Sequence, residues 1–113
     1  MVQTLRSSEA LDETQLLRAL RAVRRGDFSV RLPPQASGMG EDIAEAFNSI
    51  VELNAQLVKE LDRVGKTVGR EGKISQRVSL PGATGAWASC VDSVNGLVDD
   101  LIQRTIPPME QAL

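Results

Sequence analysis

The 113-residue chain contains no histidine, a single cysteine, and only three aromatic residues, which are two phenylalanines and one tryptophan. Without histidine, it lacks the commonest general base and the commonest metal ligand. A single cysteine, Cys90, excludes both an intrachain disulfide and a cysteine metal cluster. We therefore predict that this chain is not an enzyme and that it holds no metal and no cofactor.

The sequence also lacks an excess of either charge and any long apolar run. Its 13 basic and 15 acidic residues are well mixed, with a net charge of −2, which argues against a nucleic-acid interface. No apolar run approaches the roughly 20 residues that span a bilayer, and the N-terminus lacks the apolar core of a signal peptide. We expect a cytoplasmic protein that neither binds nucleic acid nor inserts into a membrane.

Hydrophobic residues nevertheless make up 42% of the chain, which is enough for a packed structure. With so few aromatics, that packing is expected to come from long helices rich in Leu, Ile, Val and Ala. The spacing of apolar residues predicts helices near 13–25, 42–69 and 87–105. Arg24, Arg25 and Gly26 are typical of a helix end, because cations favour the C-terminal dipole and glycine tolerates left-handed geometry.

Each predicted helix carries apolar residues at alternating spacings of 3 and 4, the heptad pattern of a coiled coil. The predicted helix core consists of Leu16, Leu20, Val23, Ile43, Phe47, Ile50, Asn54, Leu57, Leu61, Val64, Val68, Cys90, Val94, Leu97 and Leu101. Further apolar residues, among them Val51 and Val98, widen the stripe beyond a two-stranded seam. This width favours a four-helix bundle.

Two breaks, residues 26–40 and 72–86, separate the helices. Their prolines and glycines forbid a continuous helix. In the first break Phe28, Val30 and Leu32 alternate with polar residues, which indicates an extended segment. No partner strand exists in the sequence, so both breaks are predicted to be extended connectors.

The sequence repeats itself at about 46 residues. Gly26-Asp27-Phe28 matches Gly72-Lys73-Ile74, and Arg31-Leu32 matches Arg77-Val78. We therefore predict a polar lead (1–12), a first unit (13–60), a second unit (61–106) and the start of a following segment (107–113). Each unit is a helix, a connector and a helix, and the middle helix serves both units.

This arrangement resembles tandem HAMP domains, the relay modules of sensor kinases and chemoreceptors. The first unit carries RRGDFSVRLP and GEDIAEAFNSIVE, and the second carries VGREGKISQRVSLPGATGAW followed by Val94-Asn95. The resemblance covers residues 14–106 and implies an all-α fold in which each unit forms a parallel four-helix coiled coil as a homodimer. It implies connector turns at Gly26 and Gly72, and connector anchors that pack between the helices at Phe28, Leu32, Ile74 and Val78.

The function implied is a non-catalytic relay that passes helix-packing changes to a covalently linked output domain, in a two-component type of signal transduction. A purely structural coiled-coil spacer is the alternative. A third hypothesis, a helix lying on a membrane surface, is disfavoured by the unbroken heptad register and the mixed charges.

Several residues allow two interpretations. Asn54 either specifies the register of the coiled coil or destabilises the junction of the units so that two packings coexist. Gly65 and Gly69 mark either a frayed helix end or a close helix approach and soft point. Asn48 and Asn95 either bind the connector, which the resemblance favours, or face solvent.

Two groups of potentially reactive residues are given structural interpretations. Cys90 is interpreted as a small buried hydrophobe rather than as a redox site. The carboxylates of Glu41, Asp42 and Glu45 are interpreted as helix-start charges rather than as a metal or acid–base cluster, because no histidine accompanies them.

Overall fold

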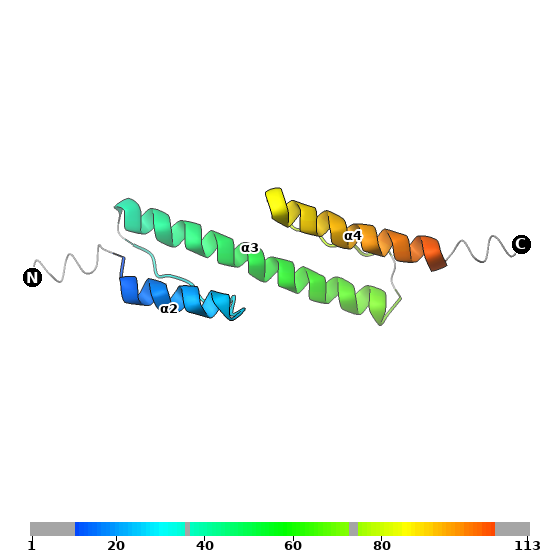
Figure 1. Ribbon diagram of the computed structural model, residues 1–113, viewed down its shortest axis with the longest axis horizontal. Coiled ribbons are helices and arrows are strands. Elements are labelled where there is room, and N and C mark those ends of the chain that lie inside the picture. The colour runs from blue at the N-terminus through cyan, green and yellow to red at the C-terminus, as the bar shows by residue number, and fades with distance from the viewer. Residues whose placement is uncertain (1–10, 36, 73–74, 106–113) are drawn as a thin grey trace, which may run out of the picture. The chain divides into compact units, whose positions relative to one another are not determined.

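The computed structural model describes residues 11–35, 37–72 and 75–105. Within these ranges the chain forms three helices and no strand: α2 (Glu13–Arg24), α3 (Gly38–Gly69) and α4 (Gly85–Thr105) (Figure 1). The predicted all-helical class is thereby confirmed. No helix in the described part of the chain has both the length and the apolar character needed to cross a membrane.

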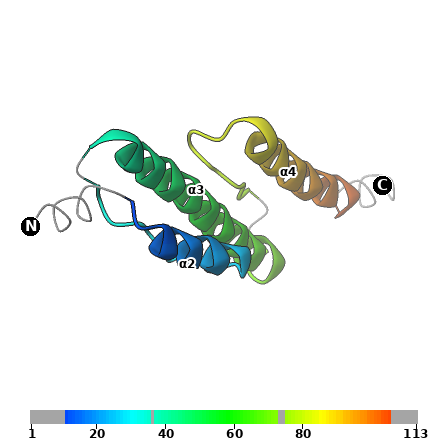
Figure 2. The same cartoon turned by 60° about the vertical axis from the view of Figure 1, so that its left-hand side comes forward.

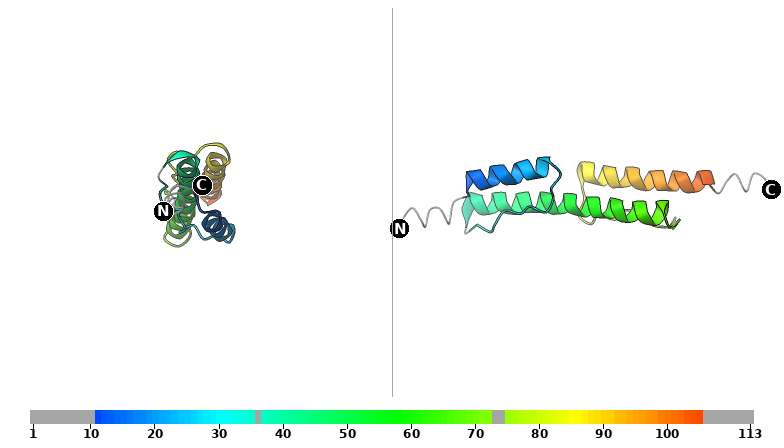
Figure 3. Two further views of the ribbon diagram at one scale, coloured as in Figure 1. Left: turned by 90° about the vertical axis from the view of Figure 1, so that its left-hand side faces the viewer. Right: turned by 90° about the horizontal axis from the view of Figure 1, so that it is seen from below.

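The chain divides into two compact units, Met1–Ala55 (unit 1) and Gln56–Leu113 (unit 2), and the division falls inside α3. In unit 1, α2 runs beside the first part of α3 in the same direction (Figures 1 and 3). The connector between them returns along the two helices to the start of α3 (Figure 2). In unit 2, α4 likewise runs parallel to the later part of α3 (Figure 3).

Both ends of α2 are capped, and the cap at Gly26 is the one that the sequence predicted. Asp12 accepts hydrogen bonds from the backbone N–H groups of Thr14 (2.9 Å) and Gln15 (3.3 Å), which have no partner inside the helix. At the other end Gly26 adopts a φ of +87°. This left-handed geometry lets Gly26 and Asp27 donate back to Val23 and Ala22, in the manner of a Schellman motif.

The second helix of each unit begins earlier than the sequence predicted. The sequence predicts breaks at 26–40 and 72–86, but α3 begins at Gly38 and α4 at Gly85. Both residues have a positive φ, +77° and +56° respectively, so a glycine at each helix entry turns the connector into the helix. Glycines that were interpreted as helix breakers therefore stand at the helix starts.

The core of unit 1 is built from both of its helices and from its connector. Ala19 of α2, Leu32 of the connector and Val51 of α3 are buried, with exposed fractions of 8%, 2% and 1%. Ala44 and Phe47 complete this cluster. The connector thus contributes Leu32 to a cluster that both helices build.

The core of unit 2 repeats this arrangement with different side chains. Val64 of α3, Val78 of the connector and Val98 of α4 form its buried cluster. These three occupy the positions that Ala19, Leu32 and Val51 hold in the repeat. Val68, Val91, Val94 and Ile102 pack around them. The sequence repeat is therefore also a repeat of packing.

We predict that Val51→Ala lowers the free energy of unfolding by about 2 kcal/mol, because two buried methyl groups are lost and a cavity remains. Val58→Ala is the matched control, since Val58 lies in the same helix and is 51% exposed. Chemical denaturation of both variants measures the difference. Equal losses would contradict the burial pattern of α3.

Candidate functional site

The predicted connector anchors differ in how deeply they are buried. Leu32 and Val78 retain only 2% and 4% of their exposure, although both lie outside helices. Phe28 is partly buried and packs against the unit 1 core. Ile74 lies outside the described residues. Gly26 and Gly72, the predicted connector turns, have positive φ angles of 87° and 72°.

An asparagine side chain holds each connector to the second helix of its unit. The Leu32 N–H donates to Oδ1 of Asn48 at 2.7 Å, and Nδ2 of Asn48 donates to the Leu32 carbonyl at 2.9 Å. Asn95 makes the same two hydrogen bonds with Val78, at 2.8 and 3.0 Å. Of the two interpretations of these asparagines, the connector contact is the one observed. We call this paired arrangement the amide clamp.

An arginine next to each clamped residue forms an ion pair with the same helix. Arg31 pairs with Glu52 in unit 1, and Arg77 pairs with Asp99 in unit 2 at 2.7 Å. Both arginines also donate to the carbonyl of the residue before them. These pairs are largely exposed, so they orient the connector while adding little to stability.

Unit 2 has an additional polar network, which we call the latch, between α3 and its connector. Arg63 donates to both carboxylate oxygens of Glu60, to Oε1 of Gln76 at 2.7 Å and to the Arg77 carbonyl at 2.8 Å. The Ser79 N–H donates to the Glu60 carboxylate at 2.9 Å. The pKa of Glu60 is lowered from 4.5 to about 2, mainly by the hydrogen bond from Arg63 and to a smaller extent by that from Ser79.

The predicted helix core divides into residues covered within the protomer and residues left exposed. Phe47 and Val64 are buried. Partial burial is found for Leu16, Val23, Asn54, Leu57, Val68, Cys90 and Val94. The exposed members are Leu20 (48%), Ile43 (37%), Ile50 (49%), Leu61 (37%), Leu97 (63%) and Leu101 (55%). Each unit contributes three of these six large apolar side chains, which we call the exposed stripe.

Helix geometry explains why some residues of the predicted helix core are covered within the protomer and others are exposed. Successive residues of a helix are rotated by about 100°. Ala44 and Val51 therefore lie on one side of α3, facing the unit 1 core, whereas Ile43 and Ile50 lie on an adjacent side. Asn48 lies about 40° from Ala44, at the border of the core side that is farther from Ile43, where it binds the connector. The first part of α3 is thus covered by the protomer along its core side and left exposed along the side of Ile43 and Ile50.

The structure also shows the contacts of the other residues that the sequence singled out. Asn54 is partly buried, and its Nδ2 donates to the Ile50 carbonyl one turn earlier at 2.8 Å. Cys90 is a partly buried free thiol. A Cβ atom added at Gly65 or Gly69 would meet nothing within 4 Å. Among the described residues, no close approach requires glycine at these two positions.

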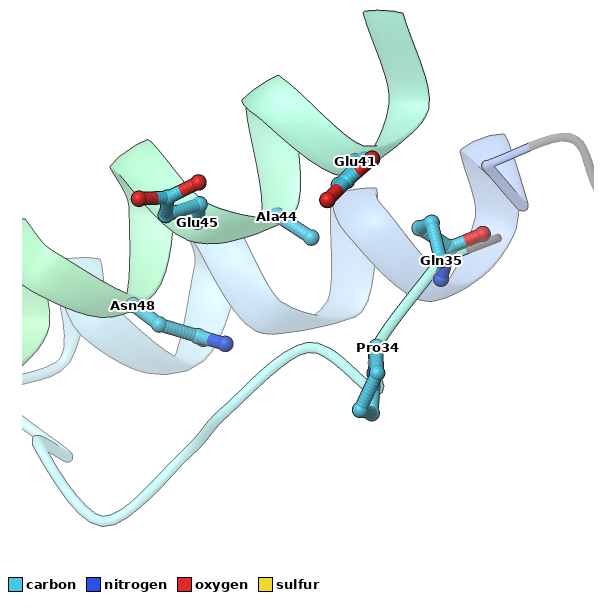
Figure 4. A pocket seen from close by; sticks show the side chains of 6 residues that line it. All are labelled: Pro34, Gln35, Glu41, Ala44, Glu45 and Asn48. Atoms are coloured by element: carbon cyan, nitrogen blue, oxygen red, sulfur yellow. The ribbon is translucent and has the colours of Figure 1, made fainter. Parts of the chain in front are cut away.

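A shallow hollow of about 250 Å³ in unit 1 lies beside the carboxylates of Glu41 and Glu45 (Figure 4). Pro34, Gln35, Ala44 and Asn48 complete its lining. Both carboxylates are exposed, and Asn48 is already bonded to Leu32. The hollow is therefore an open surface feature beside exposed carboxylates, and the Asn48 amide in its lining already holds the connector. Across the described residues, no group of three or more potential metal-ligating side chains gathers.

Some residues that build the site were not predicted. Ala22, Ala44 and Leu80 are buried, with exposed fractions of 5%, 3% and 7%, but stand outside the predicted core. Ala44 matches Val91 in the repeat, so an alignment of the two units contains a signal for it. Leu80 matches Pro34, and nothing in that pair marks Leu80 as buried. The ion pairs of Arg31 and Arg77 were also missed, although the arginines occupy matching positions.

No protein-family model matches the chain, and no solved structure gives a significant match to it.

We predict that Asn48→Ala lowers the free energy of unfolding by about 1–3 kcal/mol, because the backbone groups of buried Leu32 lose their partners. Ser49→Ala, at an exposed neighbouring position of the same helix, is the control and should change stability little. Urea titrations of both variants measure this. An unchanged stability for Asn48→Ala would mean that water replaces the clamp without cost.

The lowered pKa of Glu60 predicts a contribution to stability that depends on pH. Because the folded-state pKa is lower than the unfolded value, the contribution is full above pH 4.5 and is lost as the pH falls towards 2. Glu60→Gln should therefore lose less stability than the wild type between these pH values. Denaturation titrations across this range measure the effect, with Glu45→Gln as the control at an exposed carboxylate. Parallel curves for wild type and Glu60→Gln would contradict it.

Proposed function

We propose that this chain is a non-catalytic signal-relay module that works as a parallel homodimer. In this proposal the exposed stripe of one protomer packs against that of a second copy, so that each unit becomes a four-helix parallel coiled coil. A change of helix packing in unit 1 then passes along α3 into unit 2 and on to a covalently linked output domain. The resemblance to tandem HAMP domains and the geometry of each unit support this reading.

The exposed stripe is the observation that carries the proposal. Ile50 and Leu97 occupy matching positions in the repeat and are 49% and 63% exposed. Isolated apolar residues are common on protein surfaces, but here they recur at heptad positions in both units. Burying such side chains stabilises an assembly by about 25 cal/mol for each Å² of apolar surface that is removed from water. A second copy offers the same stripe, and two-fold symmetry lets like surfaces meet.

The distribution of the stripe within the units supports a parallel orientation in this proposal. Each unit contains two parallel helices with stripe residues on both, for example Leu20 on α2 and Ile50 on α3. In a parallel dimer unit 1 meets unit 1, so the smaller residues of the unit 1 core lie at the same level in both protomers. An antiparallel dimer would instead pair unit 1 with unit 2, whose stripes differ in sequence.

A relay also requires two packings that differ by only a few kcal/mol, so that an input can shift the population between them. Asn54 supports such a balance, because it is the polar member of an otherwise apolar column, next to the division between the units. Its side chain bonds to its own helix, at the Ile50 carbonyl. In a dimer core this position would carry a polar group where a leucine would pack better.

Replacing Asn54 tests whether the chain is a relay or a spacer. We predict that Asn54→Leu raises the melting temperature of the dimeric chain and locks the output of the parent protein on or off. Ser49→Leu, at an exposed position on another side of α3, is the control and should do neither. The measurements are thermal unfolding of this chain and output activity of the parent protein across its stimulus range.

The outcomes of this experiment separate the two functions. A stabilised Asn54→Leu variant with a normal stimulus response would refute the relay and leave the structural spacer. A destabilised variant would show that Asn54 makes necessary hydrogen bonds in the assembled protein, which would contradict the balance that we assign to it.

A further inference from the structure

Both units consist of a helix, a connector and a second helix, but their connectors are held to their first helices by different contacts. In unit 2 the latch joins Glu60 and Arg63 of α3 to the connector through Gln76, the Arg77 carbonyl and the Ser79 N–H. The repeat places Gln15 and Arg18 of α2 at the positions of Glu60 and Arg63. In the described part of unit 1, neither of these side chains makes a hydrogen bond or ion pair with the connector.

The sequence of unit 1 lacks the groups from which the latch is made. Pro33 stands where unit 2 has Ser79, and proline has no N–H to donate. Val30 stands where unit 2 has Gln76, so the side-chain acceptor for the arginine is missing. Gln15 replaces Glu60 and has no charge to pair with Arg18. The difference between the units therefore follows from residue chemistry, in addition to the observed contacts.

Apart from the latch, the polar contacts of the two connectors are nearly equal. Both have an amide clamp, and both have an arginine ion pair to the second helix. These contacts hold the connector to α3 in unit 1 and to α4 in unit 2. The latch adds the other helix of unit 2, so its connector bridges both helices with polar contacts. Among the described residues of unit 1, the connector contacts α2 through the backbone hydrogen bonds of Gly26 and Asp27 at the helix end, and its side-chain hydrogen bonds to a helix reach only α3.

We propose that the latch makes the unit 2 connector the more firmly held, so that the unit 1 connector opens first when helix packing changes. In unit 2, the later part of α3, the connector and α4 then move together, whereas α2 can shift against its connector. This inference concerns the opening of the connectors in the chain itself and holds whether or not the chain relays a signal.

The glycines of α3 do not remove this difference. Gly65 and Gly69 each weaken the helix by roughly 1 kcal/mol relative to alanine. Both follow Glu60 and Arg63, the α3 members of the latch, so the latch is attached to the helix before the glycines. Thr67 adds hydrogen bonds to the Arg63 and Val64 carbonyls in the same stretch. The end of α3 can therefore fray while the connector stays attached at Glu60 and Arg63.

Amide hydrogen exchange measured by NMR on the full chain tests the proposal directly. The Leu32 and Val78 amides are suitable probes, because each donates to the Oδ1 atom of a clamp asparagine. After correction for intrinsic rates, Val78 should be protected about tenfold more than Leu32, a factor that corresponds to about 1.4 kcal/mol. Equal protection, or stronger protection at Leu32, would overturn the proposal.

Two variants assign the difference to the latch. Arg63→Gln should bring the protection of Val78 close to that of Leu32 and leave Leu32 unchanged. Lys66→Gln is the matched control, because it breaks the Lys66–Asp62 pair on the same helix without touching the connector. An Arg63→Gln variant that keeps the wild-type ratio would refute the role of the latch.

A gain of protection in unit 1 gives an independent test that does not rely on a weakened protein. The double variant Gln15→Glu with Pro33→Ser supplies a carboxylate beside Arg18 and an N–H at position 33. It should raise the protection of the Leu32 amide severalfold without changing that of Val78. If Arg63→Gln unfolds the chain, this variant and the wild-type ratio still decide the question. Unchanged protection of Leu32 would count against the latch.

Discussion

The amide clamp is the interaction on which the arrangement of each unit depends. Two parallel helices need a connector that returns along their length, and such a segment carries backbone N–H and C=O groups without strand partners. Where the connector enters the core, at Leu32 and Val78, those groups would be buried and unpaired. The side-chain amide of Asn48 or Asn95 offers one acceptor and one donor in the required geometry. Burial of the anchor side chain therefore becomes compatible with a non-helical backbone.

Around this shared interaction the two units use different means to hold their helices together. Unit 1 packs Ala19 of α2 with Ala44, Phe47 and Val51 of α3 and with Leu32 of the connector. Unit 2 has valines throughout its buried cluster and adds a polar network on α3. The exposed ion pairs add little to the stability of either unit. The polar contacts of the connectors differ between the units, because only in unit 2 do side-chain hydrogen bonds join the connector to both helices.

The sequence predicted much of this organisation, because the repeat and the heptad spacing each have a direct physical meaning. The helices follow from them, whereas the connector turns and the burial of Leu32 and Val78 were expected only from the resemblance to tandem HAMP domains. The heptad pattern could not show which flank of the stripe faces the protomer, since Ile50 and Val51 are equally apolar and differ only in rotation about α3. Glycine was also ambiguous, because Gly38 and Gly85 break helices in general and here begin them. The partners of Arg31 and Arg77 depend on tertiary contacts that no local pattern encodes.

The central claim, that the exposed stripes of two copies meet in parallel, is tested most directly by cysteine cross-linking in a Cys90→Ser background. Separate Ile50→Cys and Leu97→Cys variants place one thiol in the stripe of each unit, and Ser49→Cys provides an off-stripe control. The account predicts that both stripe variants form cross-linked dimers on oxidation, whereas the control does not, because only stripe residues approach their symmetry mates. A chain that stays monomeric at high micromolar concentration, or a stripe thiol that reacts no faster than the control, would contradict it.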